Sequence, residues 1–356
     1  MKILDDVKKI KKLDSKNMLG SLESLYYQIE EVFEIAKKMK LSGEYKKANR
    51  ILVMGMGGSA LGAHIIKTFN FDSLKLPLEI INGYHLPAYA DKNTLVICSS
   101  YSGSTEEILN SAAEAKKKKT KLLIICSGGK LGEFAKLNKI PALIFTTNNN
   151  PCGSPRMGLG YSIFGQLLLF DKIGLIKFGK KEIDEVLQVV KTSDSRFGVN
   201  VSSANNPAKR LAEEVFGKSV WFVGAEHLIG NAHVAGNQMN ENAKRFSGYF
   251  AIPELNHHLL EGMIYPKTNK SNLAFLLFTS NFYDLRVQKR FIITADVLNK
   301  NKIKNITYDC YLKTKLGQVC EVLVLGSYLS YYCGILQGID PTAIPFVDYF
   351  KERLKK

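Results

Sequence analysis

Two segments rich in glycine and hydroxyl residues could bind a charged ligand. The first, Gly55-Met56-Gly57-Gly58-Ser59, follows a short apolar run (51–54) and precedes a stretch with helical periodicity. In a strand–glycine–helix arrangement, free backbone N–H groups and the positive end of the helix dipole point toward the same place, which favours an anion. The sequence therefore predicts a phosphate site at this turn.

The same residues also fit the dinucleotide-binding pattern G-x-G-x-x-A, which ends here at Ala60. That pattern needs an acidic residue at the end of the next strand, where it binds a ribose hydroxyl. Glu79 is at a suitable distance along the chain, but it begins the run 79–81, and that run ends in Asn82-Gly83. A nicotinamide-dependent dehydrogenase is therefore the less favoured interpretation.

The second segment follows another apolar run (94–98). From Ser100 to Thr105, every residue except Gly103 has a hydroxyl group. Hydroxyl donors and free amides at a helix N-terminus suit a phosphomonoester dianion. However, Ser104-Thr105 followed by Glu107 is also a capping-box arrangement, so this segment alone leaves both interpretations open.

The elements that position these turns have the pattern of a parallel α/β sheet, in which short buried strands alternate with helices. Residues 1–48 differ, because their i, i+3, i+4 apolar spacing predicts leading amphipathic helices that pack over the sheet. In the first half, the expected strands are 51–54, 78–81, 94–98, 121–126 and 142–146. Both turns should then lie at the carboxyl ends of neighbouring strands.

The pattern begins again in the second half, with strands at 220–223, 273–278 and 304–308 and helices near 229–245, 284–299, 317–336 and 343–354. Residues 222–233 repeat the strand, turn and helix of residues 53–64, which suggests two similarly built, doubly wound domains. The predicted division is a helical segment (1–48), a first domain (49–178), a linker region (179–207) with one helical piece at 183–190, and a second domain with a C-terminal helix (208–356).

Composition and charge narrow the function. The net charge of +16 favours anionic ligands. Lys116 to Lys119 has no interleaved aromatic residues and fits the solvated end of a helix, so we expect no nucleic-acid partner. Small residues interrupt the apolar stretch 322–336, which predicts a buried core helix and no membrane span.

The cysteines and the N-terminus indicate the compartment. The six cysteines include no C-x-x-C pair and no histidine at zinc-site spacing, so we expect free thiols and no metal site. The first residues become charged before an apolar run can form, which argues against a secretion signal and for the cytoplasm.

The two turns together resemble the phosphate-binding turns of the sugar isomerase domain. Four further motifs, in order, resemble those of the bifunctional phosphoglucose/phosphomannose isomerase family. They are Ser154-Pro155-Arg156-Met157-Gly158-Leu159-Gly160-Tyr161, Asn237-Gln238-Met239-Asn240-Glu241-Asn242-Ala243-Lys244, Pro253-Glu254-Leu255-Asn256-His257 and Gly338-Ile339-Asp340-Pro341. The resemblance spans about residue 51 to the C-terminus.

This resemblance implies an aldose–ketose isomerase that works through a cis-enediol with no metal and no cofactor. It implies a phosphorylated hexose substrate and a homodimer with shared active sites. By resemblance, Glu241 transfers the proton, His257 opens the sugar ring, Arg156 lies near the reacting carbons, and Lys351 is the family's C-terminal lysine. The family's phosphate-binding positions match Gly57, Gly58, Ser59, Ser100, Ser102 and Thr105.

The sequence departs from the family pattern at two places. His258-Leu259 follows His257 where the family tends to have Asn-Glu, and Ile344 is near a position where the family can place a threonine. The first departure affects the surroundings of the histidine, and the second bears on mannose-phosphate activity.

The chemistry of these residue types fits their implied roles. A carboxylate can move a proton between C1 and C2, an arginine can stabilise the enediolate without titrating, and a histidine can protonate the ring oxygen near neutral pH. Taken alone, Glu241 would be an exposed helix residue that pairs with Arg245 at i+4. A binding module that senses sugar phosphates is the alternative function, but it would not need Glu241, His257 and Arg156 together.

Overall fold

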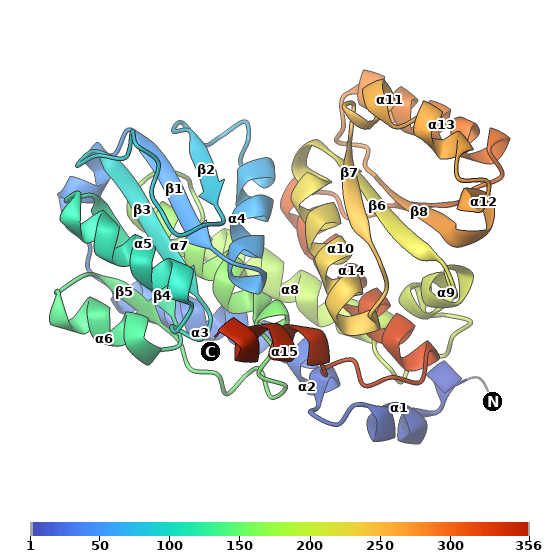
Figure 1. The fold of residues 1–356 in the computed structure, drawn as a ribbon, viewed down its shortest axis with the longest axis horizontal. Helices are drawn as coiled ribbons and strands as arrows, with labels where there is room; N and C mark the ends of the chain where they lie inside the picture. Colours follow the sequence, from blue (N-terminus) through green and yellow to red (C-terminus); the bar gives the residue numbers. More distant parts are fainter. Residues whose placement is uncertain (1–2, 355–356) are drawn as a thin grey trace.

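The computed structural model describes residues 3–354, apart from the side chain of Asp194, and contains two parallel β-sheets flanked by helices (Figure 1). The first sheet has the order β2-β1-β3-β4-β5, so β2 lies on one side of β1 and the later strands lie on the other. Its strands are β1 (Arg50–Gly55), β2 (Leu78–Ile81), β3 (Thr94–Ser100), β4 (Lys121–Cys126) and β5 (Ala142–Ile144). Its helices are α4 (Gly58–Phe69), α5 (Glu106–Lys117), α6 (Gly129–Leu137) and α7 (Gly165–Lys172).

The second sheet repeats this plan with the order β7-β6-β8-β9. Its strands are β6 (Ser219–Ala225), β7 (Gly248–Ile252), β8 (Leu273–Thr279) and β9 (Lys304–Asp309). Its helices are α9 (Pro207–Glu214), α10 (Ile229–Ala243), α11 (Leu255–His258), α12 (Asn269–Asn272), α13 (Leu285–Lys300), α14 (Lys315–Leu336) and α15 (Pro345–Leu354). All strand pairs are parallel, which confirms the predicted α/β class with two doubly wound sheets. The sequence analysis missed β7, a five-residue edge strand in which only Ile252 is buried.

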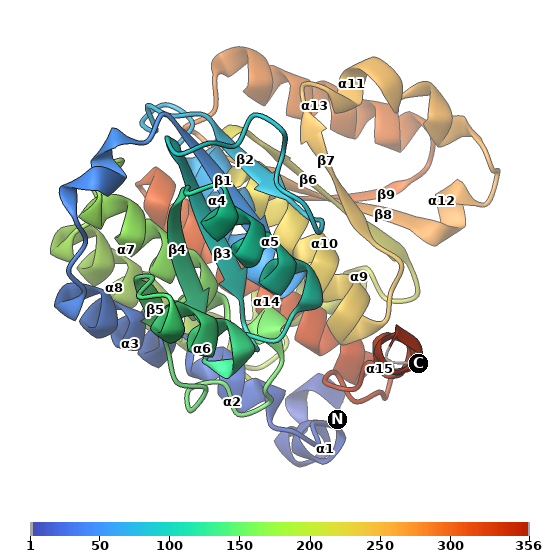
Figure 2. The same ribbon diagram turned by 60° about the vertical axis from the view of Figure 1, so that its left-hand side comes forward.

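The apolar stretch near residues 322–336 is the core helix that the sequence predicts, although α14 is longer, with 22 residues. By length and composition it could cross a membrane, but 94% of its most apolar window is buried inside the protein. It packs against α8 (Lys180–Phe197), α9 and α10. Figure 2 shows α10 between the two sheets.

The leading helices are α1 (Val7–Leu13), α2 (Met18–Glu23) and α3 (Leu25–Lys38). α3 contacts the first sheet at β5 and also packs against α7 and α8. The segment before it reaches the second half instead: Lys209 forms an ion pair of 3.3 Å with Asp5, and the Tyr331 hydroxyl donates to Asp14 at 3.1 Å. The expectation that all these helices pack over the first sheet was therefore too simple.

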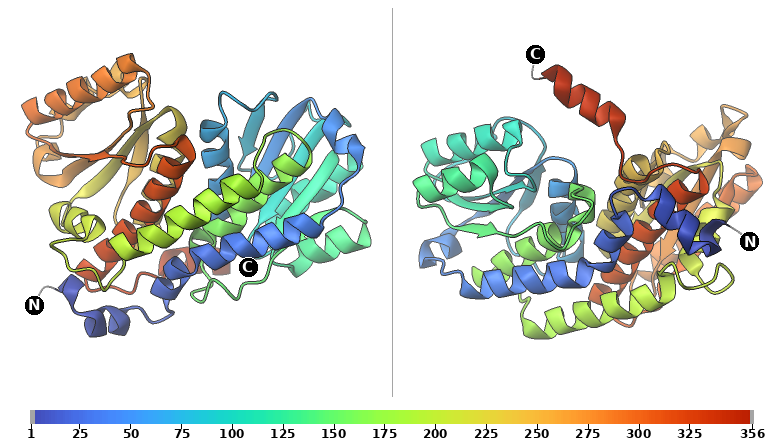
Figure 3. Two further views of the ribbon diagram at one scale, coloured as in Figure 1. Left: turned by 180° about the vertical axis from the view of Figure 1, so that it is seen from behind. Right: turned by 90° about the horizontal axis from the view of Figure 1, so that it is seen from below.

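The predicted linker region contains a full helix. α8 extends over 18 residues, well beyond the expected piece at 183–190, and lies beside α3 and α14 (Figure 3, left). Most of its apolar residues, among them Val186 and Val190, are buried. The structure thus joins the two halves by packed helices, and the boundaries 49–178 and 208–356 stay a prediction.

Candidate active site

The glycine turn after β1 lies against the loop that contains Arg156. Gly57 directly precedes α4 and has a φ of +48°, a backbone conformation that residues with a Cβ atom rarely adopt. A Cβ atom at Gly58 would lie 2.7 Å from the carbonyl carbon of Pro155 and 2.8 Å from the amide nitrogen of Arg156. Only glycine therefore permits this close approach of the two backbones.

The hydroxyl segment after β3 meets the same turn. β1 and β3 are neighbours with Gly55 opposite Ser99, so both turns lie at the same edge of the sheet, as the sequence predicts. The Ser59 hydroxyl accepts the N–H of Tyr101 at 2.8 Å, and the Ser99 hydroxyl donates to the carbonyl of Ser59 at 2.9 Å. The two turns are therefore in direct contact.

The hydroxyl groups of this segment also interact with one another. Ser100 and Thr105 are joined by a hydrogen bond of 2.8 Å between their side-chain oxygens. Ser102 is exposed, and its hydroxyl accepts the N–H of Ser104 at 3.3 Å. Thr105 is the N-cap residue of α5, but its side chain makes no capping hydrogen bond. The Thr105 hydroxyl therefore faces Ser100 and does not form a capping box.

Arg156 connects the two halves of the molecule. It is 1% exposed in the short helix η3 (Pro155–Met157), and its Nη1 lies 3.2 Å from a carboxylate oxygen of Glu241 in α10. Its Nε donates to Asn242 Oδ1 at 2.5 Å, and its Nη2 donates to the carbonyls of Pro341 and Thr342 at 3.0 Å each. Burial lowers the pKa of Arg156, and the carboxylate of Glu241 opposes this effect.

Glu241 does not behave as an ordinary surface residue of a helix. Its expected i+4 partner Arg245 is buried and donates instead to Gln337 Oε1 and to the carbonyl of Val215, both at 2.8 Å. Glu241, which is partly exposed, faces Arg156. A fixed cation and a solvent-accessible carboxylate thus lie beside the two turns.

The sequence analysis missed a second cation at this site, Lys244. It ends α10 in the left-handed conformation, with a φ of +50°. Its Nζ donates to the carbonyls of Asp340 and Pro341, at 2.8 and 3.0 Å, and to that of Asn242 at 3.3 Å. Desolvation and the nearby Arg156 lower the pKa of Lys244 to about 8. Lys244 and Asp340 both belong to motifs that the sequence analysis had singled out, but their spacing gave no sign that they meet.

His257 and Lys351 lie away from Arg156 and Glu241 in this single chain. His257 is exposed on α11, which follows the carboxyl end of β7, whereas Glu241 is in the last turn of α10. Figure 1 shows α11 at the opposite end of the second half from that turn. Lys351 is exposed on α15. The Nε2 of the neighbouring His258 lies 2.6 Å from a carboxylate oxygen of Glu254.

The cysteines are free thiols. All six are unpaired, and Cys310 alone among them is only partly buried. Within residues 3–354, no group of three or more His, Cys, Asp or Glu side chains is arranged to hold a metal ion.

Comparison with known proteins identifies the family. Residues 44–140 match the SIS domain, and residues 204–354 match the bacterial phospho-glucose isomerase C-terminal SIS domain. The bifunctional phosphoglucose/phosphomannose isomerase of Caldicellulosiruptor bescii is 33% identical, over 95% of this chain and 98% of its own length. The chain belongs to the bifunctional phosphoglucose/phosphomannose isomerase family.

More distant relatives agree with this membership. The family member from Thermoplasma volcanium is 28% identical, over 91% of this chain and 98% of its own length. A solved structure, the C-terminal domain of glucosamine-fructose-6-phosphate aminotransferase from Francisella tularensis, has a TM-score of 0.63 at 15% identity and covers 89% of this chain and 96% of its own. That likeness supports the double-SIS fold alone.

Proposed function

We propose that this chain is an aldose–ketose isomerase that interconverts glucose 6-phosphate and mannose 6-phosphate with fructose 6-phosphate. The observation that carries this proposal is the ion pair between buried Arg156 and partly exposed Glu241, beside the glycine turn. A module that only senses sugar phosphates would need the turn but not this pair. The proposed setting is hexose phosphate metabolism in the cytoplasm, in glycolysis and gluconeogenesis.

The substrate phosphate would bind between the two turns of the first sheet. The N-terminus of α4 and the amides around Gly57 and Gly58 would face the dianion. Ser59, Ser100, Ser102 and Thr105 would donate their hydroxyls, and Ser100 and Thr105 would exchange their mutual hydrogen bond for bonds to phosphate oxygens.

Glu241 would then act as the base. It would take the proton from C2 of the open-chain aldose and return it to C1 of the cis-enediol, while the proton of the hydroxyl moves between O1 and O2. The guanidinium of Arg156 would stabilise the negative charge that develops on those oxygens, because it stays charged and is already held by Asn242 and the carbonyls of Pro341 and Thr342. These steps need no metal and no redox cofactor.

The proposal includes a homodimer in which His257 of one copy completes the site of the other. It is supported by the exposure of His257 and by its position at the far end of the second half from Glu241. His257 would protonate the ring oxygen during ring opening. Lys351, on the exposed helix α15, is proposed as a further substrate contact.

The enediol explains why both aldoses are expected. C2 is planar in this intermediate and has lost its configuration, so a proton returned to either face gives glucose or mannose 6-phosphate. This outcome requires free space near C2. Ile344 is the residue most expected to restrict that space. If the enzyme formed glucose 6-phosphate but no mannose 6-phosphate, we would attribute this to Ile344.

The decisive assay uses fructose 6-phosphate with a chelator present and measures glucose and mannose 6-phosphates separately. We expect both products without an added cofactor. A second assay mixes two inactive variants, Glu241→Gln and His257→Ala, and we expect part of the activity to return once subunits exchange. No product in the first assay would refute the isomerase, and a mixture that stays inactive despite subunit exchange would refute the shared site.

A further inference from the structure

The C-terminal helix α15 has an apolar stripe that nothing in the described chain buries. All ten of its residues are exposed. Phe346, Val347, Phe350 and Leu354 have the i, i+3, i+4 spacing of one helix face, and Phe346 is 87% exposed. Isolated helices shorter than about 12–15 residues are only marginally stable in water. A helix of this length with such a stripe therefore needs a surface to pack on.

The start of α15 is fixed to the candidate active site. Arg156 and Lys244 both donate to the carbonyl of Pro341, and together they also hold the carbonyls of Asp340 and Thr342. Only residues 343 and 344 separate this anchored segment from Pro345. α15 consequently extends away from both halves (Figure 3, right), and so short a connection gives it little freedom to fold back.

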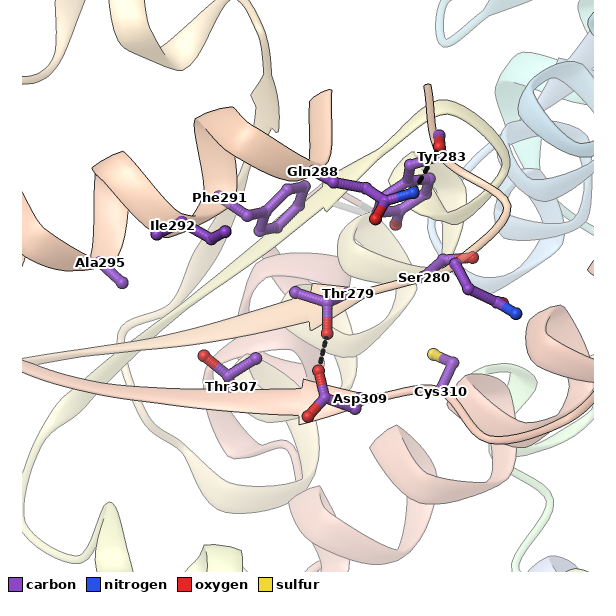
Figure 4. Close-up of a pocket in the computed structure, with 11 residues that line it drawn as sticks. Thr279, Ser280, Tyr283, Gln288, Phe291, Ile292, Ala295, Thr307, Asp309 and Cys310 are labelled. Carbon is purple, nitrogen blue, oxygen red and sulfur yellow. Dashed lines mark hydrogen bonds between the residues drawn. The ribbon is translucent and has the colours of Figure 1, made fainter. Parts of the chain in front are cut away.

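A groove with a mostly apolar surface, suited to an apolar helix stripe, lies under α13. A cavity of about 520 Å³ separates this helix from the ends of β8 and β9. Figure 4 shows Phe291, Ile292 and Ala295 of α13 facing Thr279 and Thr307 across it. Ile292 is 73% exposed, and Leu285 at the start of α13 is 80% exposed.

This groove is out of reach of the chain's own C-terminal helix. In two views, α13 lies at the top of the second half and α15 lies at the bottom (Figures 1 and 2). A second copy of the chain, turned about a two-fold axis, would present its groove to α15 of the first copy. Its own α15 would in turn enter the groove of the first copy.

We propose that α15 of each copy docks in the α13 groove of a second copy. The stripe contains two aromatic residues, Phe346 and Phe350. Two exchanged helices would thus bury roughly 600–1,000 Å² through these rings, and Val347, Leu354 and the groove walls would add the area that a stable interface needs.

The same contact is consistent with the proposed function. α11 is joined to α13 by a hydrogen bond of 2.8 Å from Asn256 to Thr294, so the docked face brings His257 toward the Arg156–Glu241 end of the other copy. The inference assumes the dimer of the proposed function, but it depends on no catalytic step.

The experiment tests the partner and the docking surface separately. In a Cys310→Ser background, which removes the thiol that lines the groove, a Phe350→Cys chain is mixed with an Ile292→Cys chain and oxidised mildly. We expect a disulfide-linked heterodimer, at least tenfold more abundant than the product of Phe350→Cys with Leu137→Cys. Leu137 is an equally accessible residue on α6, 82% exposed and far from the groove.

Light scattering measures the association itself. The full chain should be a dimer, and a chain that ends at Ile344 should dimerise at least a hundredfold more weakly. Ile292→Asp should have the same effect, and Leu137→Asp should have none. A dimeric truncated chain, a monomeric full chain or a cross-link no stronger than the control would each overturn the inference. If the cross-linked dimer forms but fructose 6-phosphate is not isomerised, docking stands and the proposed function fails. An active monomer would overturn the docking and the shared site, and only the isomerase activity would stand.

Discussion

The carboxyl edges of the two sheets have the same plan but different contents. Aligning residues 53–64 with 222–233 places Gly57 opposite Glu226, and both have a positive φ, +48° and +43°. At the first edge the space beside the turn is left to hydroxyl groups. At the second, the Glu226 carboxylate accepts the N–H of Asp284, the N-cap residue of α13, at 2.9 Å.

The difference shows how a repeated domain can keep its fold and lose a ligand. A carboxylate of the protein already lies at the second edge, where it accepts the N–H at the start of α13 and would repel an external anion. The position of Gly58 is taken by His227, which is buried and bonded to Gln318. We therefore expect substrate phosphate at the first edge only.

The largest expected effect is on catalysis by Glu241. Replacing it with Gln preserves shape and hydrogen-bonding length but removes the base, so kcat should fall by roughly two to four orders of magnitude while substrate still binds. Exchange of solvent deuterium into C2 of the product should disappear as well. The matched control is Glu226→Gln at the second edge, which should leave kcat and KM unchanged. Near-normal turnover of Glu241→Gln would mean that the base is elsewhere, and Glu254 would be the next candidate.

The next effect concerns phosphate binding. Removing the hydroxyls of Ser102 and Thr105 together should raise KM about tenfold to a hundredfold with a much smaller change in kcat, because water can replace part of each lost contact and the net contribution of a hydrogen bond is about 0.5–1.5 kcal/mol. Asn281→Ala, in the turn after β8, serves as the control from the second edge. Steady-state kinetics with fructose 6-phosphate measures both variants. An equal rise in KM for Asn281→Ala would contradict the assignment of phosphate to the first edge.

A third effect arises where the two repeats meet. His64 and His233, equivalent positions in the alignment, contact each other with ring centroids 4.1 Å apart. Burial and the neighbouring His233 lower the pKa of His64 from 6.5 to about 4. Above pH 6.5 the ring is neutral in both the folded and the unfolded chain. Below it, the unfolded chain binds the proton first, so the free energy of unfolding should decrease as the pH falls from 6.5 toward 4.

The expected loss is up to about 2 kcal/mol by pH 5, from the pKa difference of this one group. Urea unfolding at pH 7 and pH 5 measures it. His64→Gln should show a smaller loss over the same interval, and His85→Gln, at an exposed histidine, should lose as much as the parent chain. The same acid sensitivity in His64→Gln would argue against this contact as its source.

The last effect, which concerns thermal stability alone, tests the close approach at the first edge. In Gly58→Ala, the added methyl group would meet the backbone of Pro155 and Arg156 at 2.7–2.8 Å, so one backbone must move. We expect a loss of about 1–3 kcal/mol, the usual range for overpacking, seen as a lower Tm. Gly43→Ala, where nothing lies within 4 Å of the new atom, should not change Tm by more than a degree or two. Equal melting temperatures for the two variants would show that the first edge is not tightly packed.

Much of the fold could be predicted because its signals are local. Six of the predicted strands, β1, β3, β4, β5, β6 and β8, have continuous apolar runs, and β1 and β3 end in the turns that mark a sheet edge. β7 was missed because it is a short edge strand with little burial. α8 was underestimated because residues 191–197 are mostly polar and pack through only a few side chains, Phe197 among them.

The candidate site was predictable in its residue types but not in its geometry. Chain order alone gives no reason for Arg156 to meet Glu241, 85 positions away, or for Lys244 to reach Asp340, 96 positions away. Nor could the pattern show that Glu241 would form no ion pair with Arg245. That outcome depends on the burial of Arg245, which donates hydrogen bonds to Val215 and Gln337.

The sequence by itself determined the α/β class, the two glycine and hydroxyl turns and the family motifs, because periodicity and turn chemistry act over a few residues. The tertiary structure decided which charged groups lose water, which carboxylate meets which cation, and which of two similar sheet edges stays open. It also left α15 without a covering surface, a fact invisible in an ordinary amphipathic pattern. Long-range contacts and burial depend on the packing of the whole chain, so only the folded molecule reveals them.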